Sequence, residues 1–399
     1  MRCIQFSSYT RTETPMKVLI LNPGSSSLRY ALISADPPTG DQVRGKELLS
    51  GVLEPISDHA EAASKLFARM QWTAADFDLM ALRVVQGGDL YLEPVRIDDQ
   101  AVTNLIELED LAPLHNASSV AVFRAFQQAF QMSPRSAVPA VAIFDSSFHR
   151  TIPAIAHTYA IPHELAAKHK IRRYGFHGIS HNYLMLRYAE MMGTPVTRTN
   201  IITLHLGGGC SATAIYNGES VDTSMGFTPL EGLVMGTRSG DIDPAVVGFL
   251  ARKENISAAE VERLLNTQSG LLGISGISQD MRVLMERANT DERARLALDV
   301  FCYRAKKYVG AYLAAMGGAA AVVFSGGIGE GASRIRQSIC AGLENLGLEL
   351  DPALNTDGEG ERRITREGSR LHAYVIPTDE GMMMAHLALC WHVRETGGR

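Results

Sequence analysis

Residues 17–33 read KVLILNPGSSSLRYALI, and this stretch decides how the chain folds. A short apolar run enters a turn rich in glycine and serine, and a partly alternating run of polar and apolar residues follows. Two strands joined by a tight turn are typical of this pattern. Residues 201–216, IITLHLGGGCSATAIY, repeat the order of strand, glycine turn and strand. The repetition predicts an α/β domain that occurs twice, with two phosphate-binding turns across one cleft.

The rest of the chain predicts further strands and several helices. Residues 321–324 are a predicted strand that enters a glycine-rich turn over 325–331, and a helix is expected from about Ser333. Residues 375–377 are a last predicted strand, and the charged segment 354–369 is predicted to be a surface loop. Apolar spacing predicts helices over 117–131, 180–192, 256–266, 292–316, 331–346 and 381–395.

Composition excludes several classes of protein. The 399 residues are 46% apolar and 20% charged, which is typical of a globular protein of about two domains. A formal net charge of -5 argues against nucleic acid as a partner. The five cysteines lack CxxC pairing and predict reduced thiols, hence a cytoplasmic protein. Residues 1–15 lack the apolar core of a signal peptide, and glycines interrupt the apolar stretch 310–329, so no membrane partner is expected.

Polar residues are concentrated in the middle of the chain. Residues 174–181 read YGFHGISH, and residues 222–232 read DTSMGFTPLEG. Packing alone does not require so much glycine, histidine and hydroxyl in one region. Such residues are typical of places where backbone must approach an anion closely. The sequence therefore predicts an active site that handles phosphate.

Five segments carry a resemblance to a known family. Residues 22–28, 112–116, 144–149, 176–178 and 223–238 resemble, in this order, the motifs of the acetate kinase family. The resemblance runs from about Lys17 to the C-terminus. It implies the actin-like, sugar kinase and Hsp70 superfold, an α/β fold with two ribonuclease-H-like domains around a central ATP cleft. It also implies reversible, in-line transfer of the γ-phosphoryl group of ATP to acetate, giving acetyl phosphate and ADP.

The resemblance also implies a domain division, a metal and an oligomer. Residues 1–15 would be a flexible N-terminal extension. Residues 16–150 would form the acceptor-side domain together with a C-terminal helix over 381–399, and residues 151–380 the nucleotide-binding domain. Mg2+ is the expected metal, with Mn2+ as an alternative, and a homodimer is the expected assembly.

Five side chains match the family's catalytic positions. Arg83 would bind the substrate carboxylate and Arg238 would stabilise the transition state, because guanidinium groups bind oxyanions bidentately. His177 would contact the transferring phosphoryl group, and His115 would orient Arg83 or a carboxylate. Asp145 matches the catalytic acid of the family. Since acetate is already ionised at neutral pH, we expect Asp145 to orient Arg83 or the water shell of the metal.

Other positions match the family's binding residues. Asn22 and Glu380 would hold Mg2+, partly through water. The small apolar acceptor pocket would be formed by Val85, Leu114, Phe176 and Pro229. The nucleotide would be bound by Ser25, Ser27, Arg29, His205, Leu206, Gly207, Gly208, Gly209, Asp280, Met281, Arg282, Gly327, Ile328, Gly329, Glu330 and Gly331.

The chain departs from the family pattern at a few positions, and alternatives stay open. Gly208 and Gly331 stand where the family commonly has Asn, so two side-chain amides are missing from the nucleotide loops. The other departures are Arg29, Leu82, Gln86 and Met281. A kinase of propionate or another short-chain carboxylate is the close alternative to an acetate kinase. A non-catalytic nucleotide-binding module of the same superfold is a further alternative, against which the presence of Arg83, His177 and Arg238 argues.

Overall fold

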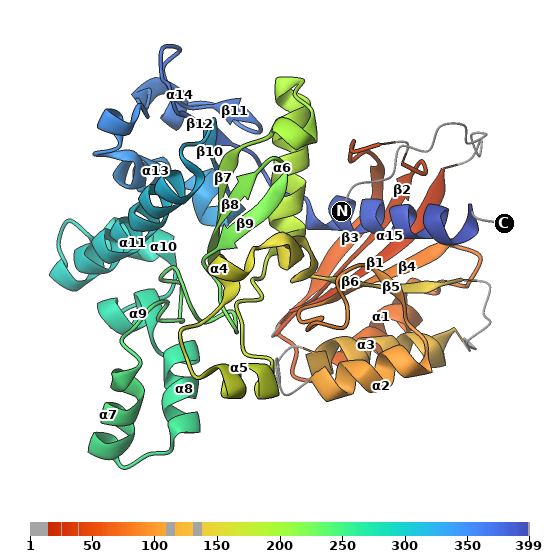
Figure 1. Cartoon of the computed structure of the whole chain (residues 1–399). Helices are drawn as coiled ribbons and strands as arrows, with labels where there is room; N and C mark the ends of the chain where they lie inside the picture. The colour runs from red at the N-terminus through yellow and green to blue at the C-terminus, as the bar shows by residue number, and fades with distance from the viewer. Residues whose placement is uncertain (1–14, 25, 39, 109–115, 131–137, 398–399) are drawn as a thin grey trace. The chain divides into compact units, whose positions relative to one another are not determined.

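The chain forms two compact units. The computed structural model describes residues 15–24, 26–38, 40–108, 116–130 and 138–397 (Figure 1). Unit 1 comprises Met1–Arg150, Phe176–Glu190 and Asp379–Arg399. Unit 2 comprises Thr151–Gly175 and Met191–Thr378. The predicted domains share the boundary at residue 150 with this division, whereas residues 176–190, expected in the second domain, cluster with unit 1.

Unit 1 contains a six-stranded mixed sheet whose strands have the order β3-β2-β1-β4-β6-β5. Strands β1, β2 and β3 are antiparallel neighbours, β1, β4 and β6 are parallel, and β5 is antiparallel to β6. The register of the first hairpin pairs Asn22 with Arg29. The strands are β1 Met16–Pro23, β2 Leu28–Ala35, β3 Lys46–Leu53, β4 Leu79–Val84, β5 Val95–Arg96 and β6 Ala140–Phe144.

Unit 2 repeats this topology strand for strand. Its order is β11-β12-β10-β7-β8-β9, with β7, β8 and β9 antiparallel, β7, β10 and β12 parallel, and β11 antiparallel to β12. The predicted duplication and the predicted α/β fold are therefore confirmed. The strands are β7 Ile201–Leu206, β8 Cys210–Tyr216, β9 Glu219–Thr223, β10 Ala321–Ser325, β11 Arg362–Arg363 and β12 His372–Val375.

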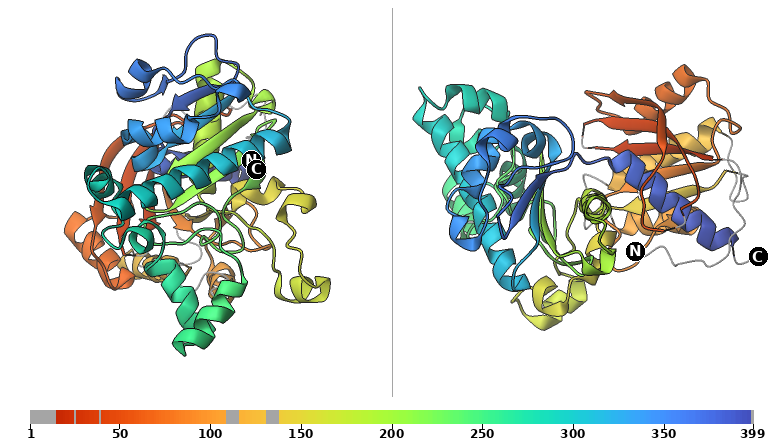
Figure 2. Two further views of the ribbon diagram at one scale, coloured as in Figure 1. Left: turned by 90° about the vertical axis from the view of Figure 1, so that its left-hand side faces the viewer. Right: turned by 90° about the horizontal axis from the view of Figure 1, so that it is seen from above.

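Helices cover the sheets of both units. In unit 1, α1 and α3 lie on one face of the sheet and α15 lies on the other, and in unit 2 the long helix α11 crosses the sheet (Figures 1 and 2). Among the described residues, no helix combines the length and apolar character that crossing a bilayer requires. The α-helices are α1 His59–Met70, α2 Asp99–Glu107, α3 Asn116–Ala129, α4 Ala154–His157, α5 His163–His169, α6 Gly178–Met192, α7 Ala245–Glu254, α8 Ala258–Thr267, α9 Gly270–Ser275, α10 Met281–Arg287, α11 Glu292–Met316, α12 Gly326–Gly331, α13 Ser333–Cys340, α14 Pro352–Thr356 and α15 Glu380–Thr396.

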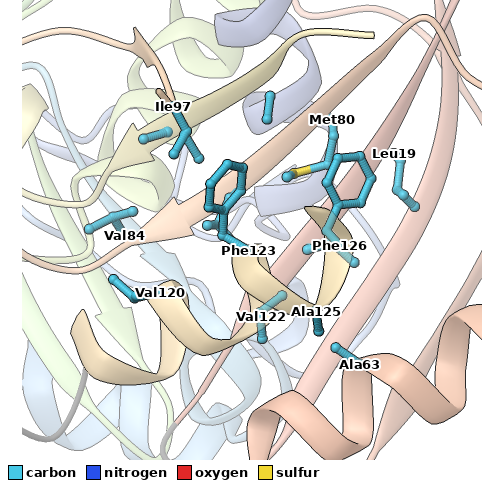
Figure 3. Close-up of a cluster of buried hydrophobic side chains, with 14 of the residues drawn as sticks. Leu19, Ala63, Met80, Val84, Ile97, Val120, Val122, Phe123, Ala125 and Phe126 are labelled. Carbon is cyan, nitrogen blue, oxygen red and sulfur yellow. The ribbon is translucent and has the colours of Figure 1, made fainter. Parts of the chain in front are cut away.

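The apolar core of unit 1 fixes the strands that carry polar residues at their ends. Leu19 of β1 and Met80 of β4 pack against Phe123 and Phe126 of α3 (Figure 3). These side chains point to one face of the sheet because successive residues of a strand alternate between its faces. The rigid packing of β1, β4 and β6 holds their carboxyl ends in register.

Two sequence predictions need correction. The glycines of 325–331 do not form a turn; all four of them lie in the short helix α12. The segment 354–369 contains the end of α14 and the strand β11 in addition to loop. Cys210, Cys302 and Cys340 are free and buried, as expected. Short elements escape pattern reading because they contain too few residues to show a period.

Candidate active site

The carboxyl ends of the three parallel strands of unit 1 bring three predicted site residues together. Asn22 lies near the end of β1, Arg83 near the end of β4, and Asp145 directly after β6. Parallel strands end at the same edge of a sheet, and ligands of open α/β sheets bind at that edge. The topology therefore assembles these residues although 123 positions separate Asn22 from Asp145.

Arg83 is the centre of this group. Its Nε and one Nη donate to Asp145 Oδ2, with the Nε–Oδ2 distance at 3.2 Å. The other Nη donates to Asn22 Oδ1 at 3.3 Å and to the Pro23 carbonyl at 3.4 Å. Burial by itself lowers the pKa of Arg83, but the charges of Asp145 and Glu380 outweigh burial and raise it. Arg83 is thus a permanently charged guanidinium in a fixed orientation.

The backbone around Arg83 is held by α3. Ser119 Oγ donates to the Arg83 carbonyl at 2.9 Å. The side chain of Asn116 bonds both the N–H and the carbonyl of Gln86. Gln86 is fully buried, and its Oε1 accepts from the Gly88 N–H at 3.0 Å. These bonds fix the strand end on which Arg83 and Val85 lie.

Asn22 and Glu380, the two residues predicted to hold Mg2+, contact each other. Asn22 Nδ2 donates to Glu380 Oε2 at 3.1 Å, and Ser180 Oγ donates to Glu380 Oε1 at 2.5 Å. Within the described residues, no group of three or more His, Cys, Asp or Glu side chains is arranged to hold a metal. One carboxylate beside one amide fits Mg2+, because this ion keeps several of its waters and takes few protein ligands.

His177 precedes α6 in a backbone conformation that is uncommon for residues other than glycine. Its φ is 57°, in the left-handed region that non-glycine residues rarely adopt. The next residue, Gly178, donates its N–H to the Asp145 carbonyl at 2.9 Å, and a Cβ on Gly178 would lie 2.1 Å from that oxygen. Such strain persists where surrounding contacts enforce it and is concentrated at functional sites. The bond places His177 close to Asp145 along the backbone.

The next histidine in the sequence, His181, packs in the interior of unit 1. His181 is fully buried on α6, and its ring lies edge-on to His149 with ring centres 5.8 Å apart. His149 Nε2 is bonded to the Phe176 carbonyl at 3.0 Å. Phe176 is itself 1% exposed. These contacts pack the start of α6 against the segment that follows β6.

In unit 2, the equivalent strand ends carry the predicted nucleotide residues. His205 near the end of β7 pairs in register with Ser325 at the end of β10. The turn after β7 is closed by the Gly207 N–H, which donates to the Gly209 carbonyl at 3.0 Å. Leu206 is buried, and a Cβ on Gly208 would meet no atom within 4 Å.

Helix α12 lies beside a pocket of about 480 Å³. Gly327, Glu330 and Gly331 line this pocket together with residues of the 356–362 segment. Ile328 and Gly329 belong to the same helix. Glu330 Oε1 accepts from the Gly326 N–H at 2.9 Å within the helix and from Ser325 Oγ at 3.4 Å, and the second bond ties the helix to the end of β10. Three of the five residues predicted here therefore border a common space.

Asp280 and Arg282 form a pair with each other. Asp280 caps α10 by accepting from the Arg282 N–H, and Arg282 Nη2 lies 2.7 Å from Asp280 Oδ2. The side-chain hydrogen bond from Arg282 is the main cause that lowers the pKa of Asp280 to about 2. The Arg282 side chain is 83% exposed, whereas Met281 between them is buried. Their nucleotide role stays a prediction.

The remaining predicted residues are distributed as follows. Val85 is buried beside Arg83 in unit 1, and Pro229 lies in unit 2, where its carbonyl accepts from Arg238 Nη1 at 3.3 Å. In the first hairpin turn, the Gly24 N–H donates to the Ser27 carbonyl at 2.8 Å, and Arg29 is exposed on β2. The predicted residues Ser25, Leu114 and His115, and most of the N-terminal extension, lie outside the described residues.

The sequence reasoning missed several residues that complete the group around Arg83. Ser180, which bonds Glu380, and Ser119 and Asn116, which hold the backbone of 83–86, are examples. Ser180 lies in the polar stretch 174–181, so the high density of polar residues in this stretch could have indicated its role. Asn116 is the last residue of the segment 112–116 that carries part of the family resemblance, so that motif was its signal. Ser119 lies in an ordinary amphipathic helix, and no local pattern distinguishes it.

Two mixed sheets with the same strand order, each carrying polar residues at the carboxyl ends of its parallel strands, define the actin-like ATPase fold. The model of the acetokinase family matches residues 53–386. The chain belongs to the acetokinase family.

Curated relatives and solved structures agree with this assignment. An acetate kinase of Solibacter usitatus is 47% identical over 404 residues, covering 93% of this chain and 97% of the relative. The crystal structure of Porphyromonas gingivalis acetate kinase has a TM-score of 0.82 at 37% identity and covers 94% of this chain and 99% of that one. A propionate kinase from Francisella tularensis has a TM-score of 0.81, also at 37% identity, over 93% of this chain and 98% of that one.

Proposed function

We propose that this protein catalyses the reversible transfer of the γ-phosphoryl group of ATP to acetate, giving acetyl phosphate and ADP. The observation that carries the proposal is Arg83, whose side chain is 15% exposed and whose guanidinium is oriented by Asp145 and Asn22 at the edge of the sheet, in a chain of the acetokinase family. A fixed guanidinium at such an edge suits a small carboxylate. The relatives that are named acetate kinases support the choice of acetate.

The reaction needs little covalent chemistry from the protein. Acetate is ionised at neutral pH, so no base has to remove a proton from it. Arg83 binds the acetate oxygens, and Asp145 holds the guanidinium in place. Arg238 and His177 stabilise the charge that spreads over the transferring phosphoryl oxygens. Asn22 and Glu380 would hold Mg2+, which when bound would neutralise charge on the nucleotide phosphates.

The close alternative is a propionate kinase, which the Francisella tularensis structure favours. Both substrates share the carboxylate and differ by one methylene, which is worth roughly 1–3 kcal/mol in an apolar pocket. A coupled assay with acetate, propionate and butyrate, each against ATP and GTP, distinguishes them. We expect the highest kcat/KM with acetate and ATP. A higher kcat/KM with propionate would make propionate, and not acetate, the substrate. If none of the three carboxylates is phosphorylated, the proposal is overturned.

The metal role predicts a selective effect on magnesium dependence. Asn22→Ala and Glu380→Ala should raise the Mg2+ concentration needed for half-maximal rate, because each removes an oxygen near the expected ion. Titration of Mg2+ at fixed ATP measures this. Glu61→Ala is the matched control, since Glu61 forms only an exposed pair with Lys65. Unchanged magnesium curves in both variants would refute the metal role.

The acceptor pocket predicts a change of substrate preference. Both valines are buried, but Val84 belongs to the core cluster that packs against α3 and the adjacent Val85 does not, as expected for neighbours that point to opposite sides. Val85→Ala should raise the ratio of kcat/KM for propionate to that for acetate about tenfold, mostly through KM. Val84→Ala is the control and should leave the ratio unchanged. If Val85→Ala lowers both activities equally, Val85 is a core residue and the pocket assignment is wrong.

Gly331 offers a test of the nucleotide site. A Cβ on Gly331 would meet no atom within 4 Å, so a side chain fits there without strain. Gly331→Asn restores the amide common in the family and should lower KM for ATP by roughly twofold to tenfold, which corresponds to one hydrogen bond. Gly331→Ala fills the same space without the amide and should leave KM unchanged. Equal effects of both substitutions would place the nucleotide elsewhere.

The assembly and location are also part of this proposal. We infer a homodimer in the cytoplasm, as the resemblance to the family implies. Light scattering of the purified protein measures the first, and fractionation of cells the second. A monomer at the concentration of the assay would overturn the dimer without affecting the proposed reaction.

A further inference from the structure

The segment that carries Arg238 is long and has no regular secondary structure. Between β9, which ends at Thr223, and α7, which begins at Ala245, no helix or strand occurs. A loop of this length in a compact unit needs side-chain contacts to hold one conformation. Two hydrogen bonds of the Arg238 guanidinium go to its own loop. Its Nη1 donates to the Pro229 carbonyl at 3.3 Å and to Met235 Sδ at 3.9 Å. Backbone hydrogen bonds to the 265–272 segment hold residues 235–239, for example from the Leu271 N–H to the Met235 carbonyl and from the Ser269 N–H to the Thr237 carbonyl, both at 2.9 Å. The parts of the loop on either side of this stretch need other contacts.

Arg173 fastens the first half of the loop. Its Nη1 donates to the carbonyls of three consecutive residues, Thr223 at 2.9 Å, Ser224 at 3.1 Å and Met225 at 3.2 Å. Its Nη2 donates to Glu231 Oε1 at 2.7 Å. A single guanidinium thus ties the start of the loop to its middle, eight positions further along.

Glu231 and Tyr159 complete this first clamp. The Tyr159 hydroxyl donates to the other oxygen of Glu231 and accepts from the Phe227 N–H at 2.8 Å. A Cβ on Gly226 would lie 1.6 Å from Glu231 Oε2 and 2.1 Å from the Tyr159 hydroxyl. The absence of a side chain at Gly226 is therefore a requirement of the clamp. Burial is the largest cause that raises the pKa of Tyr159, so its hydroxyl keeps its proton.

Arg304 fastens the second half. This residue of α11 donates from Nη1 to the carbonyls of Gly232 at 3.3 Å and Asp241 at 3.2 Å, and the same nitrogen lies 3.1 Å from Asp241 Oδ2. The Asp241 carboxylate also accepts from the Gly232 N–H at 2.8 Å and from the Tyr308 hydroxyl at 2.9 Å. These bonds join Gly232 to Asp241 and so close a smaller loop, residues 232–241, that contains Arg238.

We propose that Arg173 and Arg304 are positioning residues for Arg238: two arginine clamps, Arg173–Glu231–Tyr159 and Arg304–Asp241–Tyr308, hold the conformation of the 223–241 loop. This inference rests on the proposed role of Arg238 in phosphoryl transfer. Neither Arg173 nor Arg304 would contact the substrate. Each satisfies backbone carbonyls that a loop without helix or strand leaves open, and each pairs with a carboxylate of the loop itself.

The clamps predict losses of turnover that depend on Arg238. Arg304→Ala and Arg173→Ala should lower kcat by about 10–100-fold, because a misplacement of roughly 1 Å at a reacting group costs about this much. KM for ATP and acetate should change less than about threefold. The milder Tyr308→Phe and Tyr159→Phe remove one hydroxyl each and should lower kcat severalfold. Arg295→Ala, on the same helix as Arg304, removes only a surface pair with Glu292 and should have no effect.

A double-mutant cycle separates positioning from general stability. In an Arg238→Ala background, Arg304→Ala should cost less than about threefold in kcat, since the group that it positions is gone. Arg304→Lys and Arg173→Lys keep the charge but lack the planar fork, so they should recover less than half of the loss on a logarithmic scale. Thermal unfolding of every variant shows which of them fold. Where an arginine variant does not fold, the corresponding tyrosine variant is measured in the same cycle.

The outcomes separate this inference from the proposed function. Equal losses from the clamp variants in the wild-type and Arg238→Ala backgrounds would overturn the positioning role alone. Turnover within threefold of wild type in all folded clamp variants would do the same. If Arg238→Ala itself retains full turnover, the role proposed for Arg238 and the positioning role both fail.

Discussion

Replacing Arg238 with alanine is expected to lower turnover by roughly 10³-fold or more. The transferring phosphoryl group spreads negative charge over its oxygens in the transition state, and an arginine that meets this charge supplies a factor of this size in phosphoryl transfer. Substrate affinity should change much less, because the charge develops mainly in the transition state. Steady-state kinetics in both directions of the reaction measure kcat and KM separately.

The controls for this prediction use the same position. Arg238→Lys keeps the charge without the planar fork and should recover only part of the rate. Thermal unfolding of both variants shows whether each of them folds, so that a loss of rate is not mistaken for a loss of structure. A turnover within tenfold of wild type in Arg238→Ala would show that this arginine does not stabilise the transition state.

Arg83→Met should reduce both activity and stability. Asp145 is fully buried and shares two donors of the Arg83 guanidinium, so the substitution leaves a buried carboxylate without its cation. Breaking a buried pair in this way costs roughly 3–5 kcal/mol of unfolding free energy. Loss of the carboxylate-binding charge should lower kcat/KM for acetate by about 10²–10³-fold. Urea unfolding and the coupled assay measure the two effects.

A double variant tells the two effects of Arg83 apart. Arg83→Met combined with Asp145→Asn removes both charges, and replacing a whole buried pair is often nearly neutral for stability. We expect most of the lost unfolding free energy to return, while activity stays as low as in Arg83→Met. If activity returns together with stability, Arg83 serves the fold and does not bind the substrate.

Local patterns were sufficient for the framework of the fold. The apolar runs at 17–21 and 201–206, each followed by a glycine turn and a second strand, predicted both hairpins and the duplication, and both are present. Helix 292–316 begins and ends where its spacing predicts. These features are readable because strand alternation, helical periodicity and glycine turns are encoded within a few neighbouring residues. The order of motifs also sufficed to identify the family.

The contacts that make a site from those elements were decided by tertiary structure. Glu380 bonds Asn22, which lies 358 positions earlier, because β1 and the start of α15 meet in unit 1. The sequence shows Arg173 and Arg304 as ordinary charged residues, and only the packing of α11 and the 151–175 segment brings them to the Arg238 loop. A hydrogen bond depends on positions within a few tenths of an ångström, and these positions follow from strand register and helix packing over the whole unit. No local pattern of residues contains that information.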